Sequence, residues 1–288
     1  MLSPVKNAKP HLERYFSLLA NLTYPAHLLS LGVLDSDSDD ALTAADITSI
    51  IKNGYTANET KFISGTMGSV LLHLPRLVAI GWSRVSIGTH NFGYSLSSTT
   101  RHDLSEQFRR RATLARSRNR LLSLALRDEV EWVLWIDSDL TSYSPNVLDE
   151  LLNAGRDIVV PNVVVAPGGR SYDLNSWRDP DGPGDDATPG EVLEFHNSRS
   201  KHGAPLRLEG YGQSTSLSLH NLRNGPSVRR LDGVGGGMLL VRASLHREGL
   251  VFPQFPYRGR METEGMSMLA LDMGVLSFGM PNVEVIHC

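Results

Sequence analysis

The sequence predicts an α/β protein in which a mixed sheet is flanked by helices. Three observations predict this class. Short apolar runs at 28–34, 133–136 and 157–165 are typical of strands that are buried on both faces. Segments 11–22 and 105–126 repeat their apolar residues with helical spacing. Because the second of these helices leads directly into the run at 133–136, we expect helix and strand to pack as adjacent layers.

The composition fits one globular domain of 288 residues. A net charge of -3 gives no electrostatic reason to expect a nucleic acid partner. The single cysteine, Cys288, excludes an internal disulfide and a zinc cluster built on several thiolates. We find no apolar stretch of bilayer length and no apolar core of a signal peptide. Membrane contact is therefore expected only through an anchor absent from this chain.

Strands and helices are expected to alternate in the first half, residues 1–140. They are a strand ending near residue 8, a helix at 11–22, a strand at 28–34, a helix at 41–53, a strand at 77–88 and a helix at 105–126. Asp37 belongs to a cluster of acids that follows the strand at 28–34. These acids could receive a base or ribose at the strand end, or could cap the next helix.

The helix at 105–126 combines an apolar stripe with many arginines. Asn119 falls on the stripe, so its amide is either satisfied within the core or reaches past the core to a ligand. For most of the arginines we expect a solvated basic face, with one or two of them contacting phosphate. They are Arg109, Arg110, Arg111, Arg116, Arg118 and Arg120.

Asp137 and Asp139 end the apolar run at 133–136, and a period of two points both carboxylates the same way. Ligands gather beyond the carboxyl ends of strands in open α/β sheets, and two like charges there favour a bound cation. Hard oxygen ligands suit Mg²⁺ or Mn²⁺, which clamp substrate phosphates. The alternative is that both acids merely cap the helix after Pro145.

The second half, residues 141–288, is predicted to contain a long loop over the site at about 168–210. Residues 171–178 offer aromatic and hydrogen-bonding groups that sugars favour, whereas 179–204 is expected to be a plain flexible insertion. A short helix at 148–153 precedes the strand at 157–165, which Pro161 should bend or place at an edge.

Several glycines precede the strand that ends near residue 241. Gly233 and its neighbours allow a ligand to approach the backbone closely or allow positive φ, with Asp232 at the edge. A helix at 261–274 begins with Glu262 and Glu264, which could be simple helix-dipole partners. His287 follows a final strand; it is either structural or completes a carboxylate metal site.

Motifs in one consistent order resemble the fungal mannan polymerase family of α-mannosyltransferases, glycosyltransferase family 62. They lie at residues 5–8, 21–25, 115–119, 135–139, 172–177, 231–236 and 262–265. The resemblance covers nearly the whole chain. It implies a single GT-A-type (Rossmann-like) domain over 1–288, whose halves 1–140 and 141–288 bind the nucleotide and the acceptor.

The resemblance also implies a reaction and a location. The family uses GDP-mannose and Mn²⁺, with Mg²⁺ possible, to extend an α-1,6-linked mannan on N-glycans. Related mannosyltransferase subunits are then expected partners, beside the sugar nucleotide and an oligomannoside acceptor. The implied compartment is the Golgi lumen, or the cytosol if the chain is complete.

The resemblance also assigns expected roles to residues of this sequence that stand at the positions of the family's motifs. Asp137 and Asp139 match the family's Asp-x-Asp pair and His287 matches its metal histidine. Arg110, Arg116 and Asn119 fall where the family's helix approaches the nucleotide.

The resemblance suggests a mechanism in which Asp139 and His287 hold the metal while Asp137 binds ribose or a metal-bound water. Gly265 stands where inverting relatives of this architecture carry a base, so transfer with retention is expected. Glu262 and Glu264 would then orient acceptor or mannose hydroxyls.

Two other functions compete with this one. A catalytically silent scaffold subunit could keep the same motifs. A haloacid-dehalogenase-like phosphatase is disfavoured. Its chemistry needs a downstream lysine and a late pair of aspartates, and the sequence offers neither in a suitable place.

Overall fold

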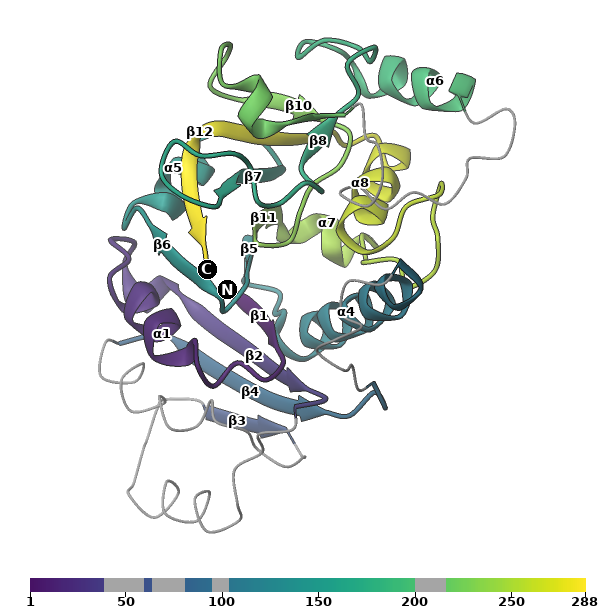
Figure 1. Cartoon of the computed structure of the whole chain (residues 1–288). Coiled ribbons are helices and arrows are strands. Elements are labelled where there is room, and N and C mark those ends of the chain that lie inside the picture. Colours follow the sequence, from purple (N-terminus) through teal and green to yellow (C-terminus); the bar gives the residue numbers. More distant parts are fainter. Residues whose placement is uncertain (39–59, 64–80, 95–103, 200–215) are drawn as a thin grey trace, which may run out of the picture.

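The computed structural model describes residues 1–38, 60–63, 81–94, 104–199 and 216–288. The helix expected at 41–53 and the beginning of the strand expected at 77–88 lie outside these residues, as does the end of the predicted loop. Within the described ranges, a large sheet runs through the molecule and helices cover it (Figure 1). The α/β class with a mixed sheet flanked by helices is therefore confirmed.

The large sheet has the strand order β10-β12-β7-β11-β5-β1-β2-β4-β3, and β6 pairs with β12. Neighbours among β1 to β5 along this path run parallel, whereas β11 is antiparallel to both β5 and β7. The strands are β1 (Leu2–Val5), β2 (Ser30–Ser36), β3 (Thr60–Ile63), β4 (Arg84–His90), β5 (Trp132–Ile136), β6 (Leu140–Tyr143), β7 (Ile158–Val164), β10 (Arg229–Leu231), β11 (Met238–Arg242) and β12 (Ser277–His287).

Strand β5 explains why the sequence shows a continuous apolar run, because it is covered on both faces. Leu134 and Ile136 pack into one core with α1 (Leu12–Ala20) and α5 (Val147–Asn153). Val133 and Trp135 pack into the other with α4 (Leu104–Ala125), α7 (Ala243–Arg247) and α8 (Glu262–Asp272). The two faces alternate along the strand, as its period of two requires. Two short 3₁₀ helices lie at Ala26–Leu28 and Leu219–Leu222.

Pro161 was expected either to bend strand β7 or to place it at an edge, and the edge alternative is wrong because β7 is central. β7 lies between β12 and β11. β11 pairs with β7 only at Ile158 and Val159, before the proline. On the other side, the register of β12 shifts between Met280, opposite Pro161, and Glu284. Because proline lacks an N–H, the ladder is interrupted beside it, which lets this residue sit inside the sheet.

The predicted loop is more ordered than the sequence suggested. It contains β8 (Trp177–Arg178), which pairs with β9 (Leu217–Ser218), and the helix α6 (Pro189–Arg199). The expectation of a plain flexible insertion is thus wrong for residues 179–199. Thr188 and Glu191 explain the helix, because the Glu191 carboxylate accepts hydrogen bonds from the backbone N–H and hydroxyl of Thr188, both at 2.7 Å. A Thr-x-x-Glu sequence with proline at the first helical position is a helix start signal that the surrounding Gly and Asp residues obscured.

Side-chain contacts anchor α6 to the rest of the molecule. His196 lies 2.9 Å from Asp232, and Arg199 donates to Asp179 at 2.6 Å. α6 also contacts α8. Among the helices in the described ranges, none combines the length and apolarity of a membrane span.

Candidate active site

The Asp-x-Asp pair lies where the sequence predicted it, at the carboxyl end of β5. The backbone N–H of Asp137 donates to the carbonyl of Gly237 at 2.9 Å, which fixes the strand end against the glycine loop. Asp137 and Asp139 line a cavity of about 390 Å³ beside the ends of β1 and β2 and one face of α4. The remaining lining residues include Pro4, Val5, Lys6, Asn7, His11, Ser36, Tyr94, Arg110, Ser117 and Arg118.

His287 joins Asp139 from the far end of the chain. Its Nε2 lies 3.2 Å from Oδ2 of Asp139, and the backbone N–H of Cys288 donates to the carbonyl of Asp139 at 3.3 Å. His287 Nδ1 donates to the carbonyl of Cys288 at 2.8 Å, because a carbonyl can only accept. In a neutral imidazole this leaves a lone pair on Nε2 facing the carboxylate. Either a proton or a metal ion must therefore lie between them.

The electrostatics of this pair agree with that geometry. Burial lowers the pKa of His287, but the hydrogen bond and charge of Asp139 outweigh it and raise the pKa. Burial raises the pKa of Asp139, yet His287 holds it below its usual range. Oδ1 of Asp139 is buried and, among the described residues, has no hydrogen-bond partner. A buried, unpartnered carboxylate oxygen beside an imidazole is a donor set that fits a divalent cation.

Asp137 has a different environment from Asp139. It does not belong to the group of ligand atoms, all within 4.8 Å of one another, that Asp139, His287 and Cys288 form. Its carboxylate instead accepts a hydrogen bond from Arg118 at 3.3 Å. Burial raises the pKa of Asp137 to about 6, Asp139 adds to the increase, and Arg118 opposes it. The structure thus brings Asp139 and His287 together, whereas Asp137 pairs with Arg118; the roles expected of the three residues stay predictions.

Two arginines of α4, Arg111 and Arg118, are buried and are exceptions to the solvated face expected for most of the six. Arg118 donates to Asp137, to the carbonyl of Gly236 and to Glu262. Arg111 donates to Glu264 at 2.5 Å and to Asn175 at 2.8 Å. A signal for this was present, because these arginines are seven residues apart on the same helical stripe as Ala115 and Leu122.

Glu262 and Glu264 are buried at the start of α8 rather than facing the cavity. Glu264 accepts hydrogen bonds from Arg111, from Arg260 at 3.1 Å and from the indole N–H of Trp177 at 2.9 Å. Burial raises the pKa of Glu264 despite these partners. Glu262 has a φ of 55°, a left-handed conformation that is rare for its residue type. Their expected role with sugar hydroxyls stays a prediction; the contacts observed are with arginines.

The glycine loop is approached by protein side chains. A Cβ on Gly236 would overlap the guanidinium of Arg118, and one on Gly235 would overlap the carboxylate of Asp173. None of the loop glycines, all of which are described, has a positive φ. The positive-φ alternative is therefore wrong, and the close approach of a ligand stays a prediction, because Arg118 and Asp173 occupy the space beside Gly236 and Gly235.

Asp232 and Gly233 are not among the residues that line the cavity. Asp232 pairs with Arg230 at 2.5 Å and with His196 at 2.9 Å. Burial raises its pKa, but these two partners outweigh it and hold the pKa of Asp232 at about 2. The expected contact of both residues with the nucleotide therefore stays a prediction, and the structure gives Asp232 a role in anchoring α6.

The remaining predicted nucleotide contacts have separate outcomes. Arg110 lines the cavity, whereas Arg116 stacks over the ring of Phe92 at 5.2 Å. Asp37 accepts hydrogen bonds from the backbone N–H groups of Phe92 and Tyr94 with one oxygen. Its other oxygen is buried and has no partner within the described ranges, and Asp37 is not among the residues that line the cavity, so its contact with a ribose stays a prediction.

Asn119 resolves to the first of its two alternatives. Its amide donates to the carbonyl of Phe252 at 2.8 Å, and its oxygen accepts from the N–H of the same residue at 2.9 Å. The side chain is thus a satisfied core residue that ties α4 to the chain before α8. Both the nitrogen and the oxygen of the Asn119 amide already have a partner in Phe252, so a ligand would have to form an additional hydrogen bond with one of them.

Tyr172 also lies at the candidate site. The sequence indicated it only as one of the aromatic and hydrogen-bonding residues at 171–178 that could contact a sugar. Its ring stacks on the imidazole of His287 with centroids 3.8 Å apart and an interplanar angle of 13°. The stack fixes the plane of the histidine, while 46% of Tyr172 is still exposed. No spacing in the sequence relates these two residues, because different segments supply them.

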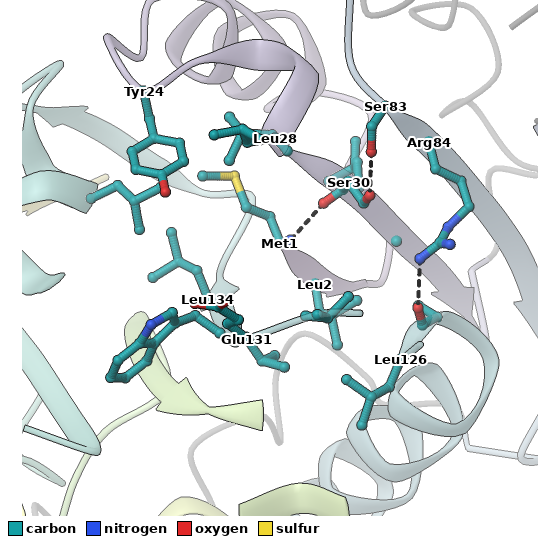
Figure 2. A pocket seen from close by; sticks show the side chains of 18 of the residues that line it. Met1, Leu2, Tyr24, Leu28, Ser30, Ser83, Arg84, Leu126, Glu131 and Leu134 are labelled. Atoms are coloured by element: carbon teal, nitrogen blue, oxygen red, sulfur yellow. Dashed lines mark hydrogen bonds between the residues drawn. The ribbon is translucent and has the colours of Figure 1, made fainter. Parts of the chain in front are cut away.

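A second cavity, of about 440 Å³, lies at the opposite ends of the parallel strands. Figure 2 shows its side chains, among them Leu2, Leu28, Leu126 and Leu134, with Met1 donating to the carbonyl of Ser30. Its lining is mostly apolar and holds neither carboxylate of the Asp-x-Asp pair. The first cavity is therefore the candidate site.

Fold and site together define an α/β protein with a cavity at the carboxyl ends of parallel strands, lined by Asp137, Asp139, Arg110 and Arg118. The chain belongs to the Anp1 family, whose family model matches residues 1–256. The family relationship that the motifs predicted is confirmed.

The relatives carry mannan polymerase names. The mannan polymerase II complex anp1 subunit of Schizosaccharomyces pombe is 32% identical over 99% of this chain and 62% of its own length. The mannan polymerase complex subunit mnn9 of the same yeast is 29% identical over 100% of this chain and 79% of its own length. For the mannan polymerase II complex ANP1 subunit of Saccharomyces cerevisiae the values are 28%, 99% and 53%. The chain thus spans less than two thirds of the length of two of these relatives.

Solved structures also match nearly the whole chain. TarS from S. aureus has a TM-score of 0.48 at 12% identity, over 99% of this chain and 58% of that chain. The mannosyltransferase PcManGT from Pyrobaculum calidifontis, solved with GDP-Man and Mn²⁺, has a TM-score of 0.43 at 12% identity, over 99% and 55%.

Proposed function

We propose that this protein is a metal-dependent, retaining mannosyltransferase that moves mannose from GDP-mannose to a mannan or N-glycan acceptor, in α-1,6 linkage. The observation that carries the proposal is the buried, unpartnered oxygen of Asp139 next to the imidazole of His287. Asp139 lines a cavity that could admit a diphosphate, and His287 contacts this carboxylate. The mannan polymerase names of the relatives support the choice of sugar.

Asp139 and His287 would hold Mn²⁺, with Mg²⁺ as the second choice, because a carboxylate and an imidazole suit such ions. When bound, the ion supplies Lewis-acid stabilisation of a departing diphosphate. Arg110 and Lys6 add positive charge on the cavity wall, which favours phosphate groups. Arg118, which also pairs with Glu262, offsets part of the negative charge of Asp137 on this wall.

In this proposal the ribose and the mannose of the nucleotide sugar contact different residues. The free oxygen of Asp37 would accept a ribose hydroxyl. Glu262 and Glu264 would act on the sugar only through the arginines that they bind, because their carboxylates are buried in those pairs. We also propose that the protein acts in the Golgi lumen together with related mannosyltransferase subunits. This part of the proposal rests on the family resemblance and on the names of the relatives as subunits of complexes.

The experiment measures GDP release and mannose transfer to an α-mannoside acceptor, with Mn²⁺ and with a chelator. Asp139→Ala and His287→Ala should abolish both while leaving the circular dichroism spectrum unchanged. Asp157→Ala is the matched control, because Asp157 is half exposed and pairs with Arg242 away from the cavity. Normal turnover in either site variant, or equal binding of UDP-sugars and GDP-mannose, would refute the proposal.

A catalytically silent subunit is the second candidate. It is favoured by the burial of Glu262 and Glu264 in arginine pairs and by the relatives' names as subunits of complexes. The same assay separates the candidates. Binding of GDP-mannose with Mn²⁺ but without GDP release, in the presence of acceptor, supports the silent subunit.

A further inference from the structure

Cys288 lies in the candidate metal site, although the proposed transfer gives it no task. Its sulfur, a carboxylate oxygen of Asp139 and a ring nitrogen of His287 all lie within 4.8 Å of one another. The side chain is exposed and forms no disulfide. Backbone hydrogen bonds hold the residue in place, because its N–H donates to Asp139 and its carbonyl accepts from His287.

We infer that Cys288 is a third metal ligand, so that the site binds Zn²⁺ more tightly than the Mn²⁺ required by the proposed function, on which this inference rests. One oxygen, one nitrogen and one sulfur ligand form a set that suits tetrahedral Zn²⁺, which accepts thiolate, imidazole and carboxylate alike. Mn²⁺ prefers oxygen ligands and binds a given site more weakly than Zn²⁺. Zn²⁺ would therefore compete with Mn²⁺ and inhibit transfer.

Binding involves a proton but no electron transfer. The thiol of Cys288 loses its proton to solvent as the sulfur–metal bond forms, so one H⁺ is released for each ion bound. The imidazole is ready for this role, since its Nδ1 already donates to a backbone carbonyl and its Nε2 faces Asp139. Such a backbone partner fixes the orientation of metal-binding histidines.

The sequence makes the test unambiguous, because it contains one cysteine. Co²⁺ is titrated into the full chain in the presence of a non-thiol reductant, and the near-ultraviolet thiolate-to-cobalt band is followed. We expect a band that saturates at one ion per chain, at two protein concentrations, and that Zn²⁺ abolishes. Cys288→Ser should lack the band, and its preference for Zn²⁺ over Mn²⁺ should fall by about tenfold or more, the scale of losses in metal sites.

Two controls define the ligand set. Asp139→Ala and His287→Ala should each weaken Co²⁺ binding and reduce the band, because the sulfur alone is a poor site. A chain with Cys288→Ser and Ser123→Cys carries its thiol on the exposed part of α4 and should show no band.

Several results would overturn the inference. These are Co²⁺ binding without a thiolate band, a band that persists in both site variants or needs two chains per ion, an unchanged metal preference in Cys288→Ser, and no binding of Co²⁺ or Zn²⁺. The proposed function is judged separately, by GDP release from the unmodified chain with Mn²⁺.

Discussion

Replacement of Arg118 by methionine should destabilise the protein strongly. The side chain is 3% exposed, and its partner Glu262 is 6% exposed. Methionine keeps much of the volume but removes the cation, so within the described part of the chain the Glu262 carboxylate retains the hydrogen bond from Thr263, at 3.2 Å. Loss of one partner of a buried ion pair costs about 3 to 5 kcal/mol of unfolding free energy. We expect Arg118→Met to lose that amount.

Urea denaturation checks the value. With a slope near 3 kcal/mol per molar urea, the midpoint should fall by about 1 to 1.7 M. Arg242→Met is the matched control, because Arg242 and Asp157 are each 46% exposed and such pairs contribute at most about 1 kcal/mol. Adding Glu262→Gln to Arg118→Met should restore much of the loss, because the buried carboxylate is then neutral, whereas Asp137, the other carboxylate partner of Arg118, is 35% exposed. The reasoning fails if the two single variants lose similar stability, or if the double variant is no better than Arg118→Met.

Three further changes test other parts of the structure. Gly236→Ala should cost about 1 to 3 kcal/mol of stability in urea, because the new methyl overlaps the guanidinium of Arg118. Burial lowers the pKa of His246 from 6.5 to about 4, so the unfolded chain binds the extra proton first as the pH falls. Stability should therefore drop by about 3 kcal/mol between pH 7 and pH 4, and a flat profile in denaturation experiments would contradict this. Tyr172→Ala removes the ring stacked on His287 and should weaken Mn²⁺ binding about tenfold in calorimetry without lowering the melting temperature; unchanged affinity would show that the stack does not orient the imidazole.

The sequence alone predicted those strands and helices in which the pattern of apolar residues reflects which side chains are buried. The apolar runs became β2, β5 and β7, and the helical periodicities became α1 and α4. Strand-end position then predicted where Asp137 and Asp139 would lie, because the carboxyl ends of parallel strands meet at one edge of the sheet. A Thr-x-x-Glu signal for α6 was also present, but the flanking composition outweighed it.

Only the tertiary structure decided which distant residues meet. The family resemblance implied that His287 joins Asp139, but only the structure placed Cys288 in the same group and stacked Tyr172 on His287, although the segments that carry them are far apart in the chain. It also buried Arg118, since α8 supplies a carboxylate that no pattern in α4 reveals. Periodicity reports how much of a side chain is covered, whereas a site depends on which groups cover it, and that pairing is set by the packing of the whole sheet.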